Sequence, residues 1–411
     1  MNLSFFQTLN RSRFTLRKTS CNHKALFSSS SINYAGKRKE VDRTKSASFV
    51  KKVDKKSQKS ATGSEETFTG AKNPLYYKPA INIQIQPISF FSTLNNHGMI
   101  FRDTTRLVVE KVLASSLAPR DKSLILNGKP GSGKSSVLLQ AASSAVNAGW
   151  FVIYAGETNS WVDSSKPYLP KLTDTKYFYQ WTLVSSFLQK IKSLNENDTL
   201  RSLLTLKKDF VLGKQKLSAD QSVFDVLDIG IKTPSLSQEA LNIVLSVLDS
   251  QADVPVMIAI DQINTFYSTT LYTDQKNVRI PAHNLLLVNS LLPYFGSVPS
   301  MNSSGDSKIG KKSLARGIAI GATSNTDSRF ISSELNSALE SCSNDPKSIS
   351  AFDFESLVVK NFTPEETFAL LEHYRLSNLI GSSPTAQSTL KLWALTSGNP
   401  HKIFKSCTKF I

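Results

Sequence analysis

Residues Gly128–Ser135 carry the clearest chemistry in the sequence. Their order fits G-x-x-x-x-G-K-[ST], with an apolar segment (Ser123–Asn127) before them and a helical segment (Ser136–Asn147) after them. Glycines let backbone N–H groups approach an anion, and the N-terminus of the following helix adds partial positive charge. The sequence therefore predicts a phosphate-binding loop for a nucleoside triphosphate or diphosphate. The alternative is a Gly-Ser turn that binds no ligand.

Eight residues in and just after this stretch are the candidates for nucleotide binding. The glycines shape the loop, the lysine reaches the β- and γ-phosphates, and the hydroxyl after it holds Mg²⁺. The candidate contacts are Gly128, Pro130, Gly131, Ser132, Gly133, Lys134, Ser135 and Ser136. Ser135 is therefore also a predicted metal ligand.

Asp261 is the second predicted Mg²⁺ ligand, because it ends the apolar segment Val254–Ile260. A carboxylate at the end of a buried strand, in a chain with a phosphate-binding loop, holds the metal directly or through water. The alternative is a buried strand that simply ends in a polar residue. The next residue is Gln262, where many ATPases have glutamate. An amide orients water but does not take its proton, so we expect little or no hydrolysis and assign no catalytic residue.

Two further segments carry polar groups that such a site can use. Gly317–Thr323 reads as another central strand, and Ser324 or Asn325 after it either senses the γ-phosphate or only ends the strand. A Gly-x-Pro turn within Thr396–His401 interrupts helical sequence. In AAA-type and related ATPases, a turn of this kind packs against the nucleotide.

An aromatic cluster falls in residues 156–250, a stretch that reads as mostly helical. Such a cluster is either a stacking platform for nucleic-acid bases or part of a packed core. Aromatic residues at helical spacing favour packing. The cluster consists of Trp161, Tyr177, Phe178, Tyr179, Trp181, Leu183 and Phe187.

The positive charge of the chain is concentrated at its N-terminus. Of the formal net charge of +17, the first 60 residues contribute +12, from fifteen Lys and Arg against three acids. Residues 1–30 contain Arg and Ser but no acid, which predicts a mitochondrial transit peptide. The alternative is a disordered basic tail of a cytosolic or nuclear protein. Residues 31–95 are predicted to be a basic, largely disordered or extended arm, for which RNA phosphate is a natural partner.

Composition excludes several classes of protein. The 3 cysteines have no paired spacing, which argues against a disulfide framework and a zinc site. No apolar run approaches the roughly 18 residues of a transmembrane helix, so no membrane contact is expected. The hydrophobic content of 40% is that of a globular protein.

The order of the predicted elements indicates an α/β fold. An apolar strand, a glycine-rich loop, a helix and a second strand (Trp150–Ala155) imply a right-handed crossover and a parallel sheet flanked by helices. We expect a nucleotide-binding α/β domain over residues 96–340, with a helical insertion at 156–250. Residues 341–411 are expected to be mainly helical.

Several stretches together resemble the mS29 family of mitochondrial small-subunit ribosomal proteins, also called the death-associated protein 3 family. The similarity spans roughly residues 95–411, with the stretches in the same order. The glycine-rich loop alone is generic, and the other stretches narrow the resemblance to this family. They are Asn159–Val162, Tyr177–Leu188, Ile258–Asn264 and Thr396–Pro400.

The resemblance implies a P-loop NTPase fold of AAA/STAND type in the small subunit of the mitochondrial ribosome. It also implies contacts with small-subunit rRNA, ribosomal proteins and the large subunit, and a bound guanine nucleotide (GTP or GDP) with Mg²⁺. No Asn-Lys-x-Asp element is present, so ATP remains possible. The alternative function is a mitochondrial matrix NTPase that acts as a remodelling or ribosome-assembly factor.

Overall fold

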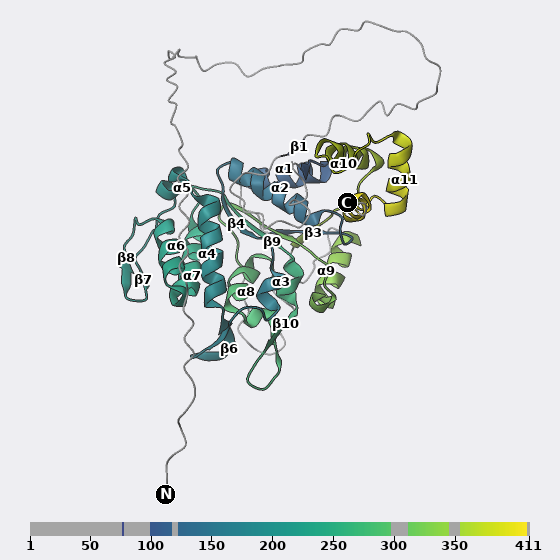
Figure 1. Cartoon of the computed structure of the whole chain (residues 1–411). Coiled ribbons are helices and arrows are strands. Elements are labelled where there is room, and N and C mark those ends of the chain that lie inside the picture. The colour runs from purple at the N-terminus through teal and green to yellow at the C-terminus, as the bar shows by residue number, and fades with distance from the viewer. Residues whose placement is uncertain (1–75, 78–98, 117–121, 297–310, 345–353, 409–411) are drawn as a thin grey trace, which may run out of the picture. The chain divides into compact units, whose positions relative to one another are not determined.

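The computed structural model describes residues 76–77, 99–116, 122–296, 311–344 and 354–408 (Figure 1). The chain divides into two units, Met1–Gly63 and Ser64–Ile411, and every described residue lies in the second. The predicted transit peptide and nearly all of the predicted basic arm lie outside the described residues. Only the short strand β1 (Tyr76–Tyr77), which pairs with β2 (Met99–Ile100), falls within that arm.

Five parallel strands form the central sheet, in the order β13-β3-β12-β9-β4. The predicted parallel α/β architecture is thereby confirmed. Every residue of β9 and β12 is buried, as expected for a parallel sheet covered on both faces. The strands are β3 (Ser123–Asn127), β4 (Phe151–Ala155), β9 (Val256–Asp261), β12 (Gly317–Ala322) and β13 (Phe354–Val358).

Helices cover both faces of this sheet, because successive strand residues point to opposite sides. In β9, Met257 and Ala259 enter the core beneath α1 and α2, whereas Val256, Ile258 and Ile260 enter the core beneath α4, α6 and α7 (Figure 1). The helices are α1 (Asp103–Ala114), α2 (Lys134–Asn147), α4 (Trp181–Asn195), α6 (Val223–Lys232) and α7 (Ser237–Ser250).

The segment between β4 and β9 contains more strand than the sequence indicated. Tyr177–Tyr179, expected to be helical, lie in β6, which pairs with β5 in an antiparallel hairpin. The cluster does pack rather than form an open platform: Trp161 is 5% exposed and lies 5.1 Å from Phe187, centroid to centroid. The remaining elements here are α3 (Asn159–Val162), β5 (Leu169–Lys171), β6 (Asp174–Tyr179), α5 (Asp198–Leu203), β7 (Phe210–Leu212) and β8 (Gln215–Leu217).

The last part of the chain is helical and has a small core of its own. Side chains such as Phe362, Leu370, Tyr374 and Ile403 form it. Reciprocal capping boxes begin two of its helices, with Thr363 before α10 and Thr385 before α11, which satisfies their first N–H groups. The helices are α10 (Pro364–Leu376), α11 (Ala386–Thr396) and α12 (Pro400–Thr408).

Shorter elements connect these parts. In the described part of the chain, no helix combines the length and the apolar character needed to cross a membrane. The connecting elements are β10 (Thr269–Thr273), β11 (Arg279–Pro281), α8 (Leu286–Leu291), α9 (Ser333–Asn344) and 3₁₀ turns at Pro234–Leu236, Ile263–Tyr267, Ala282–Asn284, Leu292–Tyr294 and Ser328–Phe330.

Candidate functional site

The glycine-rich loop joins β3 to α2 and depends on residues without side chains. Gly128, Gly131 and Gly133 have φ values of 146°, 75° and 95°, a region that favours glycine. A Cβ atom on Gly128 would lie 2.5 Å from the carbonyl oxygen of Val359, and one on Gly131 would lie 2.8 Å from Asn399 Oδ1. The loop is therefore closely covered by backbone and side chains from the C-terminal part.

Lys134 begins α2 and folds back over the loop. Its Nζ donates hydrogen bonds to the carbonyl oxygens of Gly128 (2.9 Å) and Lys129 (3.0 Å). Burial lowers the pKa of Lys134, and the charge of Asp261 opposes that shift. The ammonium group thus lies beside the loop and within the field of the carboxylate at the end of β9.

Ser135 and Asp261, distant in sequence, meet at the carboxyl edge of the sheet. The Ser135 side chain lies close enough to the Asp261 carboxylate to favour its ionised form and lower its pKa. Gln262 N–H donates to Asp261 Oδ1 at 2.9 Å. Asp261 is only 5% exposed, and burial raises its pKa to about 6 despite these contacts and the nearby Lys134. A buried carboxylate in this state gains from a cation beside it.

The oxygen donors at this edge fit a magnesium ion that keeps other ligands. Mg²⁺ prefers hard oxygens and is bound by one or two protein groups together with water and phosphate. Among the described residues, no group of three or more His, Cys, Asp or Glu could hold a metal by itself. Ser135 and Asp261 therefore suit a metal shared with a phosphate, not a site built from protein alone.

Ser132 has a buried hydroxyl that the described protein leaves without a hydrogen-bond partner. The residue is 1% exposed, and its Oγ makes no hydrogen bond within the described residues. A buried unpaired hydroxyl costs free energy, which a bound acceptor would remove. This atom lies within the loop and fits a phosphate oxygen.

Gln262 is held away from the role that a catalytic glutamate would have. It has a left-handed backbone (φ 59°), and its Oε1 accepts a hydrogen bond from Asn159 N–H at 2.9 Å. Thr158 Oγ1 donates to the carbonyl oxygen of Asp261 at 2.7 Å. The loop after β4 is therefore tied to the end of β9 through Gln262.

The end of β12 lies at the same edge. Ser324 N–H donates to Asn264 Oδ1 at 2.8 Å, and the Ser324 hydroxyl lies 2.6 Å from that of Thr326. Thr323 Oγ1 donates to Asn127 Oδ1 at 3.2 Å, which also accepts from Gly128 N–H at 2.8 Å. Neither asparagine was a sequence candidate, although Asn127 directly precedes the loop.

Arg102 is the main contact that sequence reasoning missed. It is 6% exposed and forms a salt bridge with Glu366 of α10 (Nε to Oε1, 3.0 Å). Its Nη1 donates to the Ser132 carbonyl oxygen at 3.2 Å, and its Nη2 donates to the Lys360 carbonyl oxygen at 2.9 Å. The guanidinium also lies 4.5 Å from the centroid of the Phe362 ring. Arg102 thus joins the loop to the C-terminal helices.

The Gly-x-Pro turn contacts the same loop. Asn399 Nδ2 donates to the Pro130 carbonyl oxygen at 2.8 Å, and Asn399 Oδ1 accepts from Lys402 N–H at 3.1 Å. His401 N–H donates to the Gly131 carbonyl oxygen at 3.4 Å. The turn between α11 and α12 therefore packs on the glycine-rich loop itself.

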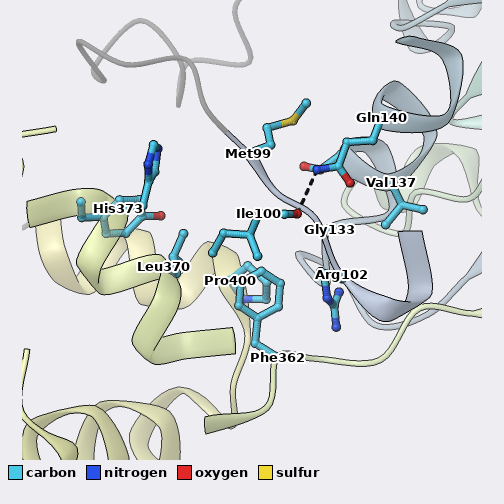
Figure 2. Close-up of a pocket in the computed structure, with 12 residues that line it drawn as sticks. Met99, Ile100, Arg102, Gly133, Val137, Gln140, Phe362, Leu370, His373 and Pro400 are labelled. Carbon is cyan, nitrogen blue, oxygen red and sulfur yellow. Dashed lines mark hydrogen bonds between the residues drawn. The ribbon is translucent and has the colours of Figure 1, made fainter. Parts of the chain in front are cut away.

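A cavity of about 70 Å³ adjoins the first turn of α2. Figure 2 shows Val137 on one side of it, Leu370 and His373 on the other, and Ile100 between them. Gln140 Nε2 donates to the Ile100 carbonyl oxygen at 2.9 Å. The lining is mostly apolar: Met99, Ile100, Arg102, Gly133, Ser136, Val137, Gln140, Phe362, Leu370, His373, Tyr374 and Pro400.

Known proteins resemble this chain over most of its length. It is 27% identical over 341 residues to the small ribosomal subunit protein mS29 of Schizosaccharomyces pombe, covering 80% of this chain and 67% of that protein. Mouse mS29 is 21% identical over 290 residues, which is 69% of each chain. A chain of a closed-state Hsp104 cryo-EM reconstruction with ATPγS and casein is 14% identical, but the TM-score is 0.25.

That Hsp104 likeness covers 75% of this chain and 42% of the other, and its score is too low to support any argument. The model of the family described as mitochondrial ribosomal death-associated protein 3 matches residues 99–406, which includes the loop, both metal candidates and the Gly-x-Pro turn. The chain belongs to this family of mitochondrial ribosomal proteins.

Proposed function

We propose that this chain is a structural component of the small subunit of the mitochondrial ribosome, and that it binds a purine nucleotide with Mg²⁺ and hydrolyses little or none of it. Both curated relatives are named small ribosomal subunit protein mS29. The mitochondrial ribosome is accordingly the location of this chain. GTP or GDP is the favoured ligand, and ATP is possible.

The observation that carries the nucleotide part is the pairing of Ser135 with Asp261 beneath the loop. In a P-loop NTPase the hydroxyl after the lysine and an acid at the end of a nearby strand hold the metal. Ser135 lies in the first turn of α2, which follows β3, and Asp261 ends β9, with β12 between these two strands. This arrangement supports a P-loop NTPase fold.

Each part of the ligand has a counterpart in the chain. Backbone N–H groups at the start of α2 and the Ser132 hydroxyl would bind phosphate oxygens. Lys134 would exchange its contacts with loop carbonyls for the β- and γ-phosphates. The apolar cavity beside Ser136 and Val137 would receive the base after widening from its present volume of about 70 Å³. A bound metal would neutralise phosphate charge and lower the pKa of Asp261.

Retention without turnover follows from the position of Gln262. Its amide oxygen is already bonded to Asn159 N–H, so it neither takes a proton nor points freely at a water molecule. A retained ligand stabilises the fold instead, by about 2.7 kcal/mol at 100 times its dissociation constant. Small-subunit rRNA, ribosomal proteins and the large subunit are the proposed partners.

A working matrix NTPase, in remodelling or ribosome assembly, is the second candidate, and Glu157 favours it. This carboxylate follows β4, the neighbour of β9 in the sheet, and its charge contributes to the raised pKa of Asp261. A carboxylate near the metal can act as a general base on the attacking water. Steady phosphate release by the purified protein that disappears in Glu157→Gln, with nucleotide affinity unchanged, would establish this second function.

Sedimentation of a mitochondrial lysate tests the ribosomal part. In a magnesium-containing sucrose gradient the chain should sediment with intact ribosomes, and at low magnesium it should stay with the small subunit in near-stoichiometric amount. A slow-sedimenting pool that never meets the subunits would overturn the proposal. Denaturing the purified chain and identifying the released nucleotide tests the other part, which fails if no nucleotide is released or rebound.

A further inference from the structure

The last described part of the chain carries positive charge without compensating acids. Glu372 is the final acidic residue of the sequence, so residues 373–411 contain neither Asp nor Glu. Lys391 on α11 and Lys402 and Lys405 on α12 are all exposed. Within the described residues, none of these three lysines takes part in an ion pair. Some exposed lysines elsewhere, such as Lys207 with Asp253, do form ion pairs, but what distinguishes this part of the chain is that its own sequence contains no acidic residue.

The basic residues of α12 lie close together on the helix. Lys402 and Lys405 are three positions apart, and His401 and Lys405 are four apart, which places them side by side on the helix. The pKa of His401 is lowered by partial burial and by the charge of Lys405, with no carboxylate acting in the opposite direction. His401 and Lys402 also lie in the first turn of α12, where the helix dipole disfavours cations.

The opposite face of α12 packs against the core of the C-terminal helices. Ile403 is fully buried in the core of the C-terminal helices, and Asn399 ties the start of the helix to the glycine-rich loop. On α11, Leu395 is 84% exposed beside Ala394, also exposed. The charged groups are therefore presented from a rigid base, which lowers the entropic cost of binding.

We propose that the exposed face of α11 and α12, with Lys391, Lys402 and Lys405, binds the phosphate backbone of RNA. This surface, named the basic face below, rests on the proposed ribosomal function and assigns the RNA contact to a particular part of the chain. Uncompensated cations on a fixed helix pair complement a polyanion, and counterion release from RNA supplies the free energy. If the basic face binds an acidic protein surface instead, RNA is not its partner.

Salt dependence of RNA binding by the full chain tests the assignment. The probe is the mitochondrial small-subunit rRNA transcribed in vitro, and affinity is measured at several salt concentrations. For the triple variant Lys391→Gln, Lys402→Gln, Lys405→Gln we expect weaker binding and a log–log salt slope shallower by about 2, at roughly 0.7–0.9 per lost phosphate contact. The charge-matched control is Lys166→Gln, Lys190→Gln, Lys276→Gln, at exposed lysines on other elements, which should keep the wild-type slope.

Two results would overturn the inference. Equal changes in both triple variants would mean that only overall charge matters, and a wild-type slope in the first variant would remove the basic face from RNA contact. If that variant keeps its slope but no longer sediments with the small subunit, the face contacts protein. Sedimentation of the wild-type chain tests the ribosomal proposal separately from RNA binding by the basic face. If the wild-type chain does not sediment with the subunits, the ribosomal proposal fails whatever the variants do.

Discussion

The two sides of the glycine-rich loop differ in how completely their polar groups are satisfied. On the side of the C-terminal helices, Arg102 has five hydrogen-bond acceptors, and Asn399 uses both the nitrogen and the oxygen of its side-chain amide. The groups that would face a ligand are less well satisfied. Among the described residues, the Ser132 hydroxyl has no partner, Lys134 donates hydrogen bonds to loop carbonyls, and the Asp261 carboxylate is buried with a raised pKa.

The groups that stabilise the structure of the loop therefore differ from the groups that would bind its ligand. The hydrogen bonds of Arg102 and Asn399 hold the loop backbone in a conformation that its glycines permit but do not enforce. The underfilled side carries an unpaired hydroxyl and a costly buried carboxylate, which a phosphate and a magnesium ion would relieve. The contrast predicts that substitutions on the first side destabilise the fold, whereas those on the second weaken ligand binding or, at Asp261, remove the cost of a buried carboxylate.

The largest expected effect is on the satisfied side, at Arg102. In Arg102→Ala, Glu366 and several carbonyl oxygens lose a buried partner, so the free energy of unfolding should fall by about 3–5 kcal/mol. Arg106→Ala is the matched control, because Arg106 and its partner Asp103 are 60% and 91% exposed and such pairs contribute under about 1 kcal/mol. Chemical denaturation of both variants checks this, and equal losses would contradict the contrast.

Asp261 should affect stability by a similar amount, but in the opposite direction, because its ionised carboxylate destabilises the fold whereas Arg102 stabilises it. Because burial raises its pKa from 3.8 to about 6, the folded state binds the proton more tightly than the unfolded state between these values. In the absence of Mg²⁺, stability should therefore be present at low pH and fall as pH rises through about 6, by about 3 kcal/mol in total.

The variant Asp261→Asn should lack this fall. Denaturation curves of the two proteins from pH 4 to pH 8, without magnesium, measure the difference. Parallel pH profiles would show that Asp261 is not held in a costly ionised state. Adding Mg²⁺ and nucleotide should reduce the loss of stability in the wild type and leave the variant unchanged.

Lys134 distinguishes ligand binding from folding. Lys134→Ala removes a charge-assisted contact of about 1.5–3 kcal/mol, so affinity for GTP, GDP or ATP should fall roughly tenfold to a hundredfold. Lys129→Ala, an exposed neighbour in the same loop, should bind almost normally. Calorimetric titration measures both, and equal affinities in the two variants would remove Lys134 from the phosphate site.

The smallest effect is expected at Gln262. In Gln262→Glu the new carboxylate would keep the hydrogen bond from Asn159 N–H and stay directed at that group. We therefore expect no gain in phosphate release from Mg-GTP or Mg-ATP. A clear rise in turnover would mean that a glutamate at position 262 is all that the site lacks for NTPase activity.

Sequence alone predicted the loop and the buried strands because both leave strong local signals. The glycines of the loop and the continuous apolar residues of β9 are readable in any context. By contrast, β13 contains Glu355 and Ser356 within a half-buried edge strand, which breaks the apolar run and hides the strand. Arg102 gives no signal at all, since its partner Glu366 lies far along the chain.

The helical prediction for Tyr177–Tyr179 was wrong for a related reason. Their strand exists because β5 pairs with it across a tight turn, and pairing partners are not visible in a count of local preferences. The domain boundaries, the nucleotide contacts and the transit peptide remain predictions. Where the sequence prediction failed, the structure depends on contacts between segments and not on local residue preferences.

The pairing of β13 with β3 has a consequence for the order of folding. Val359 N–H donates to the Asn127 carbonyl oxygen at 2.7 Å, and the Val359 carbonyl oxygen covers Gly128. During synthesis, β3 emerges long before β13 and remains an open sheet edge, the kind of surface that seeds aggregation. Closing so long a loop is a slow, non-local step, so this edge of the nascent chain stays open until β13 has emerged and paired with β3.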